Sequence, residues 1–208
     1  MTLSKYYRKI LRTRLNKNNK KKLKNKNFTI LCNNCVAGVI LHELGEKFNT
    51  PTINLWFEAS DYIKFLENLD YYLSQPLIEI KSNEDYPVAK LHDIKIYFMH
   101  YKSFDEAKIK WEQRVNRINK ENLYLIFVQR EGCTEDLLKR FDNLPYRNKV
   151  AFTAKTMPDI KCSYYIDGSA QRNGEVMDLC SYKGDFTGKR WIDDFDYVSF
   201  LNKKDTNK

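Results

Sequence analysis

Cys35 and His100 are the two side chains of this 208-residue sequence that are best suited to covalent chemistry. Cys35 stands in the first turn of an expected helix, where the helix dipole lowers the pKa of a thiol and favours the nucleophilic thiolate. His100 follows an expected strand and is predicted to act as the base for that thiol. Such a pair supports acyl or glycosyl transfer through a covalent intermediate. The alternative is that Cys35 packs in the core, as structural cysteines commonly do, and that His100 bonds a neighbouring strand.

The ends of the expected strands nominate further residues for a binding site. In open α/β sheets, ligands bind beyond the carboxyl ends of the strands, where loops and helix N-termini present backbone N–H groups. The first strand ends at Asn33 and Asn34, and the second strand of an expected hairpin ends at His100 and Tyr101. The same rule also points to the residues that follow the other strands, namely Phe57, Glu58, Gln129, Arg130, Glu131 and Lys155. All of these residues face one crevice if their strands are parallel.

Arg114 and Arg117 form a second candidate binding group, because they lie one turn apart on the same face of an expected helix. Two guanidinium groups at this spacing suit a phosphate, a carboxylate or a diphosphate. The alternative is an ordinary charged helix face in contact with water. On the first interpretation, the sequence predicts an anionic group on the ligand.

Metal and cofactor motifs are largely missing from the sequence. Cys32 and Cys35 form a C-x-x-C at a strand-to-helix junction, which leaves a redox dithiol as an alternative. The remaining cysteines, Cys133, Cys162 and Cys180, stand singly, so no second pair has the spacing of zinc ligands. The sequence has no G-x-G-x-x-G, Walker P-loop, G-x-S-x-G or H-E-x-x-H motif. We therefore predict neither a metal site nor a bound cofactor.

The elements that must position these residues follow from the hydrophobic pattern, in which short apolar runs alternate with amphipathic segments as in βαβ units. Strands are expected at 28–32, 53–57, 123–128 and 149–153, with a further one at 161–166. Helices are expected at 34–48, 60–73, 103–119, 134–144 and 193–202. The helix at 103–119 opens with a Ser103-x-x-Glu106 capping box, and a hairpin over 88–98 carries His92 and Asp93 in its turn. The sequence therefore predicts a three-layer α/β/α fold with a mixed, mainly parallel sheet and one β-hairpin.

The positive charge of the chain is concentrated at its N-terminus. The net charge is +9, yet residues 1–27 hold 11 basic residues and no acidic ones, while residues 28–208 hold 25 basic and 27 acidic residues. We expect a basic amphipathic helix over residues 1–15 and a flexible, self-repelling linker over residues 16–27. One α/β domain is expected to follow over residues 28–208.

The basic arm formed by residues 1–27 has three candidate roles. Its Leu, Ile and Tyr residues among Lys and Arg suit an anionic membrane surface or a membrane-bound polysaccharide machinery. Nucleic acid would use the same charges, but the near-neutral body argues against nucleic acid as the main partner. The third role is that of a solubilising tail or an ordinary first helix.

The location of the protein is predicted from what the sequence does not contain. No run approaches the roughly 20 apolar residues of a membrane-spanning helix, and the N-terminus has no apolar signal-peptide core. We therefore expect a cytoplasmic protein that is peripheral to the inner face of the membrane if its arm binds there. In that compartment the five cysteines are expected to be reduced rather than paired in disulfides.

Several segments of the chain resemble those of a known bacterial family. They are Asn33-Asn34-Cys35, the run TPTINL at 50–55, the run FMHY at 98–101 and the helical W-x-x-R-x-x-R-I-N at 111–119. Together they are similar to recurring segments of bacterial exopolysaccharide biosynthesis proteins, a family that is formally a domain of unknown function. The resemblance covers roughly residues 28–200. It implies a three-layer α/β body and a role in making or modifying capsule, exopolysaccharide or lipopolysaccharide, as a glycosyl- or acyl-type transferase.

The hypothesis from the sequence is therefore a transferase that acts on an activated or lipid-linked sugar at the cytoplasmic membrane face. The residues assigned to this reaction are Cys35 and His100 as nucleophile and base, Asn33 and Asn34 at sugar hydroxyls, Tyr101 as a stacking face, and Arg114 and Arg117 at a diphosphate. The alternative is a non-catalytic module that binds glycan or a partner of the polysaccharide assembly machinery.

Overall fold

A parallel sheet of four strands forms the centre of the computed structural model, which describes residues 3–203. Its strands lie in the order β1 (Thr29–Cys32), β5 (Leu123–Val128), β6 (Asn148–Thr153) and β7 (Ser163–Tyr165). All three strand pairs are parallel. These strands confirm the predicted α/β class, and each of them coincides with an apolar run that the sequence marks as a strand.

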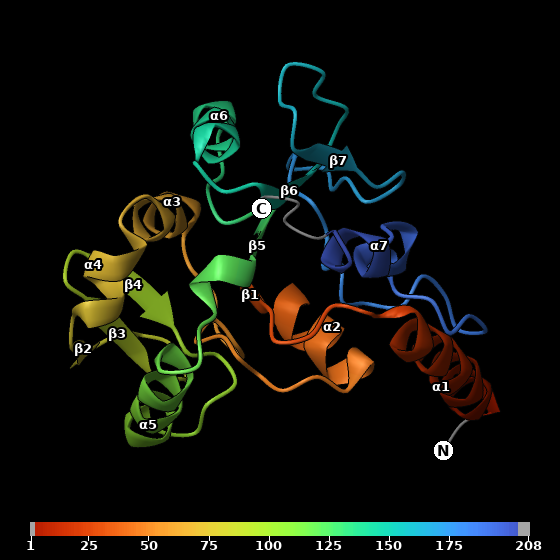
Figure 1. The fold of residues 1–208 in the computed structure, drawn as a ribbon, viewed down its shortest axis with the longest axis horizontal. Helices are drawn as coiled ribbons and strands as arrows, with labels where there is room; N and C mark the ends of the chain where they lie inside the picture. The colour runs from red at the N-terminus through yellow and green to blue at the C-terminus, as the bar shows by residue number, and fades with distance from the viewer. Residues whose placement is uncertain (1–2, 204–208) are drawn as a thin grey trace.

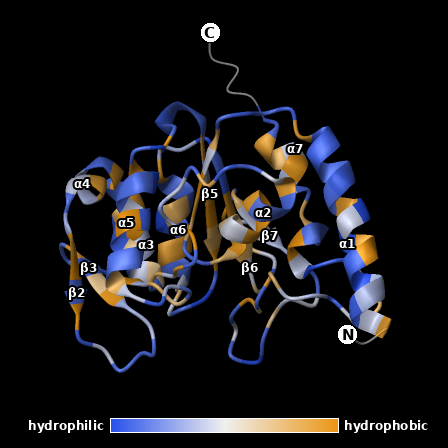
Figure 2. Ribbon diagram, turned by 90° about the horizontal axis from the view of Figure 1, so that it is seen from below, coloured by the Kyte–Doolittle hydropathy of each residue, from blue (hydrophilic) through white to orange (hydrophobic). Residues whose placement is uncertain are grey.

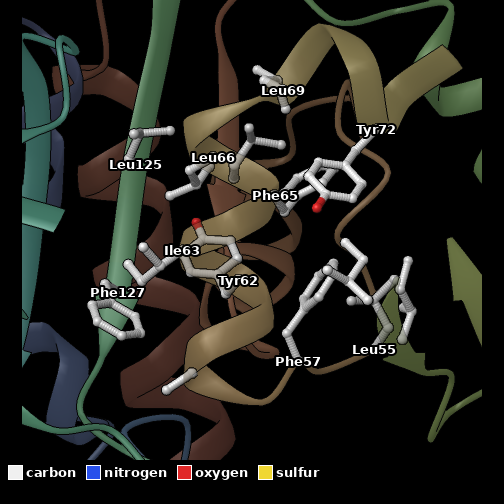
Figure 3. Close-up of a cluster of buried hydrophobic side chains, with 14 of the residues drawn as sticks. Leu55, Phe57, Tyr62, Ile63, Phe65, Leu66, Leu69, Tyr72, Leu125 and Phe127 are labelled. Carbon is white, nitrogen blue, oxygen red and sulfur yellow. The ribbon is translucent and has the colours of Figure 1, made fainter. Parts of the chain in front are cut away.

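Helices cover both faces of this sheet, which gives three layers (Figure 1). The helices on one face are α3 (Ala59–Glu67) and α6 (Glu135–Asn143), and those on the other are α2 (Val36–Leu44) and α7 (Tyr197–Leu201). Side chains of the strands alternate between the two cores, because successive residues of a strand point to opposite faces. Leu125 and Phe127 of β5 face α3, where the Phe127 ring lies 5.8 Å from that of Tyr62 between centroids (Figure 3), while Ile126 packs on the α2 side.

The predicted hairpin is confirmed, with His92 and Asp93 in its turn and His92 at a φ of 58°. It does not join the parallel sheet, however. Its strands β3 (Val88–Leu91) and β4 (Ile94–Tyr97) pair with β2 (Leu77–Ile80) in a separate antiparallel sheet of three strands. This small sheet packs in the same core as α3. Tyr97 of β4 bridges Trp56, and Phe57 bonds Asn33 just after β1. The residues that follow β4 therefore lie near the carboxyl end of β1.

The strand expected at 53–57 is absent, and a single bridge between Trp56 and Tyr97 takes its place. Asn54 has a φ of 63°, which interrupts the extended backbone. The backbone N–H of Phe57 donates to Asn33 O at 3.0 Å, just beyond the end of β1. The segment therefore connects the two sheets rather than running inside either one. Its apolar residues are buried, which explains why the sequence looks like a strand.

Helix ends follow local signals. α2 ends at Leu44, before Gly45 at a φ of 69°, rather than at residue 48. The helix expected at 60–73 is divided at Asn68 into α3 and α4 (Leu69–Ser74). Ser103 caps α5 (Phe104–Val115) as predicted, accepting from Glu106 N at 3.3 Å. Two short 3-10 helices complete the fold, η1 (Lys120–Asn122) and η2 (Trp191–Asp194).

The prediction of a flexible linker at 16–27 is wrong, because α1 (Leu3–Lys22) is one continuous helix of 20 residues. Arg12 of α1 is buried between Glu43 of α2 and Asp193 of η2, which offsets the repulsion among the lysines. Leu23 is buried, and Asn25 donates to Tyr124 Oη at 2.9 Å. The helix thus lies against the body of the protein. Among residues 3–203, no helix is both long and apolar enough to cross a membrane.

Candidate functional site

A pocket of about 470 Å³ lies beyond the carboxyl ends of β1 and β5, next to the residues that follow β4. Its lining residues are Asn34, Cys35, Val39, Trp56, Met99, His100, Arg130, Glu131, Asp178 and Cys180. A larger hollow of about 670 Å³ lies between the loop after β2 and the start of α5, and none of its lining residues follows a strand of the parallel sheet. The smaller pocket is the candidate site, because it gathers thiols, carboxylates, a guanidinium and an imidazole at the sheet edge where α/β proteins bind ligands.

The course of the chain around β1 creates this pocket. From β1 the chain runs through α2 to the segment at 53–57, which bonds beside the end of β1 through Phe57 N and Asn33 O. The chain then passes through the small sheet and α5 before it enters β5 on the opposite side of β1. β1 is followed by α2 on one face of the sheet and β5 by α6 on the other, and such opposite connections from adjacent strands open a crevice at their carboxyl ends. The pocket lies at this point of divergence.

Asn34 and Cys35 come directly before α2, at one wall of the pocket. Asn34 Oδ1 accepts from Val36 N at 3.1 Å, a local turn that leads into the helix, whose N-cap residue is Cys35. Burial is the main cause that raises the pKa of the Cys35 thiol to about 11, and the negative charge of the neighbouring Asp178 is the second. The predicted low-pKa thiolate is therefore wrong. Desolvation and a nearby negative charge outweigh the helix N-terminus, so the thiol is protonated at neutral pH.

Trp56 provides an aromatic wall that is fixed from behind. Its ring is stacked on Tyr97 with 3.8 Å between ring centroids and 7° between planes. Trp56 Nε1 donates to Tyr86 Oη at 3.3 Å, and Tyr97 Oη donates to Glu58 Oε1 at 2.8 Å. These contacts hold the indole in place at the pocket that it lines.

His100 stands at the mouth of the pocket with an exposed side chain. Its backbone N–H donates to Asn54 O at 3.3 Å, which fixes the chain just after β4. Within the described part of the chain, the His100 imidazole makes no hydrogen bond to Cys35 or to another residue. The structure thus places the predicted nucleophile and base at one pocket, as separate side chains that are not hydrogen-bonded to each other.

Arg130 and Glu131 come from the loop that follows β5. Arg130 Nε lies 3.7 Å from Glu131 Oε1, and Glu131 has a φ of 54° that turns the loop over the pocket. Burial raises the pKa of the Glu131 carboxyl, and the charges of Glu175 and Glu58 raise it further while Arg130 opposes them. Asp178 adds an exposed carboxylate from the segment after β7, where it accepts from Cys180 N at 2.9 Å.

Asn33 does not line the pocket. It is fully buried and joins β1 to β5, donating to Val128 O at 3.0 Å and accepting from Val128 N at 2.9 Å. The side chain thus replaces the backbone pairing that ends at Cys32. Both polar atoms of its amide bond Val128, so the side chain holds the ends of β1 and β5 together beside the pocket and has no role in binding a ligand.

Tyr101, Arg114 and Arg117 also lie away from the pocket lining. Tyr101 is buried and donates to Ile53 O at 3.0 Å. Arg114, also buried, donates to Tyr101 Oη at 2.5 Å and packs its guanidinium 5.6 Å from the centroid of the Phe48 ring. Arg117 donates to Phe48 O at 3.4 Å. The two arginines therefore tie the C-terminal end of α5 and the residues after it to Phe48, which follows α2.

Sequence reasoning nominated Arg130 and Glu131 by their place after a strand, but it missed Trp56, Asp178 and Cys180 as pocket residues. Trp56 was assigned to the interior of a strand. The other two lie in an irregular segment with no periodic pattern, so no local signal could have found them. Among residues 3–203, no group of three or more His, Cys, Asp or Glu side chains is arranged to hold a metal ion.

Comparison with known proteins places the chain in a family. Residues 6–202 match the model of the Domain of unknown function (DUF1919). The chain belongs to this family. The match to DUF1919 begins inside α1 rather than at residue 28, so it includes most of the N-terminal helix. The chain is also 42% identical over 188 residues to an uncharacterized protein of Haemophilus influenzae, covering 90% of each sequence. Neither match names a substrate or a reaction.

Proposed function

We propose that this protein is a transferase that acts on an activated sugar, either a nucleotide sugar or a sugar linked to a polyprenyl diphosphate. The observation that carries the proposal is the combination of groups in the pocket: the indole of Trp56, the guanidinium of Arg130 and the carboxylates of Glu131 and Asp178. A guanidinium binds phosphate groups in charge-assisted pairs. Carboxylates accept hydrogen bonds from sugar hydroxyls, and an indole offers a flat apolar surface to a sugar ring.

In the proposed reaction, Arg130 binds the diphosphate of the donor and Trp56 packs against its sugar. Glu131 accepts the proton of the acceptor hydroxyl as the acceptor oxygen bonds to the anomeric carbon and the diphosphate leaves. The raised pKa of Glu131 supports this role, because a base works best when its pKa approaches the working pH. Direct transfer also agrees with the high pKa of Cys35, since no thiolate nucleophile is required.

The pathway in this proposal, surface polysaccharide biosynthesis at the cytoplasmic membrane face, rests on the sequence resemblance described above. A second candidate function is a non-catalytic module that binds glycan in the same pocket. The protonated thiol of Cys35 favours this alternative over covalent catalysis. Binding of a sugar compound is expected of both candidates and does not separate them. Turnover of a donor would identify the transferase.

The proposal is tested by thermal melting of the full chain with a panel of nucleotide sugars, polyprenyl-phosphate analogues and acyl-coenzyme A. A ligand that binds only the native state raises its melting temperature by mass action. We expect a sugar donor to raise it and Arg130→Ala to abolish that shift. Arg117→Ala is the matched control, because Arg117 bonds Phe48 O away from the pocket.

Turnover of the donor in the panel is then measured by release of its nucleotide or polyprenyl diphosphate in the presence of a glycan acceptor. We expect Glu131→Gln to lower that rate about 100-fold or more, since general base catalysis contributes on that order. Binding without release would favour the glycan-binding module. A folded protein that shows no shift with any sugar compound would contradict both candidates.

A further inference from the structure

The two faces of α1 have the reverse of the usual polarity. The face that packs on the body carries polar side chains: Arg8 donates to Asp185 at 2.6 Å, Arg12 pairs with Glu43, and Asn19 donates to Tyr197 Oη at 2.8 Å. An ordinary surface helix buries its apolar face and exposes its polar one. The opposite arrangement here leaves the apolar side chains of the N-terminal half exposed, whereas Leu15 is half-buried.

The outward face of the N-terminal half forms an apolar stripe. We define it as Leu3, Tyr6, Tyr7 and Ile10, which are 77%, 52%, 57% and 49% exposed. Their spacing of i, i+3, i+4 and i+7 places them on one side of the helix. Figure 2 shows apolar residues in the N-terminal half of α1, at the edge of the molecule, and a hydrophilic C-terminal half.

A loop from the other end of the chain adds to this surface. The ion pair between Arg8 and Asp185 holds the loop beside the N-terminal half of α1. Phe186, the next residue, is 68% exposed. Gly188 lies so close that a methyl group at its Cα would come within 2.6 Å of Arg12 N. Two elements that are distant in sequence thus present large apolar side chains at the same edge.

On the C-terminal half of α1, the same outward side of the helix carries basic side chains. Arg14, Lys17 and Lys21 follow Ile10 at spacings of four, three and four residues, and all three are exposed. Within residues 3–203 they form no ion pair. No acidic residue occurs anywhere in α1. The outward face therefore combines an apolar end with an uncompensated basic end.

We propose that this face of α1 docks on an anionic lipid bilayer. The apolar stripe and Phe186 enter the boundary between headgroups and acyl chains, and Arg14, Lys17 and Lys21 contact lipid phosphates. A second copy of the chain would bring like charges together, since the whole helix is basic. A nucleic acid would use the lysines but gives no partner to Leu3 and Ile10. An anionic bilayer matches both ends of the face.

The proposal is tested by co-sedimentation of the full chain with vesicles of phosphatidylcholine, either alone or mixed with phosphatidylglycerol. Removing residues 1–27 is not suitable, because it would also remove Arg12 and Leu23 from the body. We expect binding only to the mixed vesicles. Ile10→Ser should weaken it about tenfold, since a buried aliphatic side chain contributes on that order. Lys17→Gln and Lys21→Gln should each weaken it about fivefold.

Ile109→Ser is the matched control, because Ile109 is 52% exposed on α5, outside this face. It should bind the mixed vesicles as the unaltered chain does, and the melting temperatures of all variants should be unchanged. Arg130→Ala, which tests the pocket, should also leave vesicle binding intact, so the two proposals fail separately. Equal binding by the Ile10→Ser variant and the unaltered chain would overturn the proposal. So would a dimer in solution that Ile10→Ser dissociates.

Discussion

Two groups of charged side chains lie at opposite ends of α2, and they differ in what surrounds them. At its C-terminal end, Glu43 accepts from Arg12 Nε and from Arg190 Nε, each at 2.8 Å. At its N-terminal end, Cys35 faces Arg130 and Glu131 across a cavity. Charges in the first group are buried and paired with each other. Those in the second group border open space and keep bonding capacity for a ligand.

The comparison shows that residue type does not decide between structural and functional roles. In the first group, Arg12 pairs with Glu43 and ties α1 to the body. In the second group, Arg130 and Glu131 are also neighbours, but both line the pocket. Arg114 belongs with the first group, since it is buried against Tyr101 and Phe48. What separates the groups is whether the side chain finds its partners within the protein. The variants below compare the two groups by stability and by ligand binding.

The largest loss of stability is expected for Glu43→Gln. The change leaves Arg12 and Arg190 without their shared carboxylate, and breaking a buried ion pair costs about 3–5 kcal/mol. Urea denaturation followed by circular dichroism measures the loss. Glu131→Gln is the matched control at the pocket, with an expected change below about 1 kcal/mol. Equal losses in the two variants would remove the distinction between the groups.

A smaller loss is expected for Arg114→Ala, which leaves the Tyr101 hydroxyl without its donor and uncovers the Phe48 ring. A hydrogen bond to a charged group contributes about 1.5–3 kcal/mol. The variant should keep the melting shift given by a sugar donor, whereas Arg130→Ala should lose the shift at nearly unchanged stability. Loss of donor binding in Arg114→Ala at intact stability would restore Arg114 and Arg117 as the phosphate site.

Gly188→Ala tests how tightly α1 is held. The added methyl would meet the α1 backbone at Arg12 and the Cβ of Leu11 at 2.7 Å, so the helix must shift. Overpacking of this kind costs about 1–3 kcal/mol. At Gly184 the nearest atom is 3.8 Å away, so Gly184→Ala should be neutral. Hydrogen exchange of α1 amides would locate the effect, and unchanged protection in Gly188→Ala would show that the helix is not packed as described.

The smallest effect concerns the pH dependence of Glu131. Its folded pKa is raised above the unfolded value of about 4.5, so the native state binds more protons than the unfolded state in that range. Its contribution to stability therefore falls as pH rises from about 4.5 through the folded pKa. Glu131→Gln should remove this slope and raise the unfolding free energy at neutral pH by less than about 1 kcal/mol. A steeper slope in the variant would contradict the raised pKa.

Much of the fold could be predicted because its signals are local. The apolar run at 123–128, the Ser103 cap and the turn at His92 each depend on neighbours in sequence. The segment at 53–57 could not be predicted in the same way, since its alternating burial comes from two different sheets. The docking of α1 depends on Arg12 meeting Glu43 and Asp193, and no local pattern records such distant pairs.

The candidate site was predictable to the extent that it follows strand ends. Cys35 and His100 meet at the pocket because β1 and β4 end there. Arg114 and Arg117 have the spacing of an anion clamp, but Arg114 is buried against Tyr101, and α5 ends at Val115, before Arg117, which donates to Phe48 O. The pKa of Cys35 could not be predicted either, because desolvation and Asp178 depend on the folded surroundings.

The most direct test of the pocket is protection of Cys35 from alkylation by a bound sugar donor. The full chain is treated with iodoacetamide at mildly alkaline pH, with and without the donor that gives the largest melting shift, and each cysteine is followed by mass spectrometry. Cys162 is the internal control, because it is also half-buried, with a pKa raised by burial to about 12, and lies outside the pocket. We predict that the donor slows alkylation of Cys35 and leaves that of Cys162 unchanged. Equal rates at Cys35 with and without donor would contradict the assignment of the site.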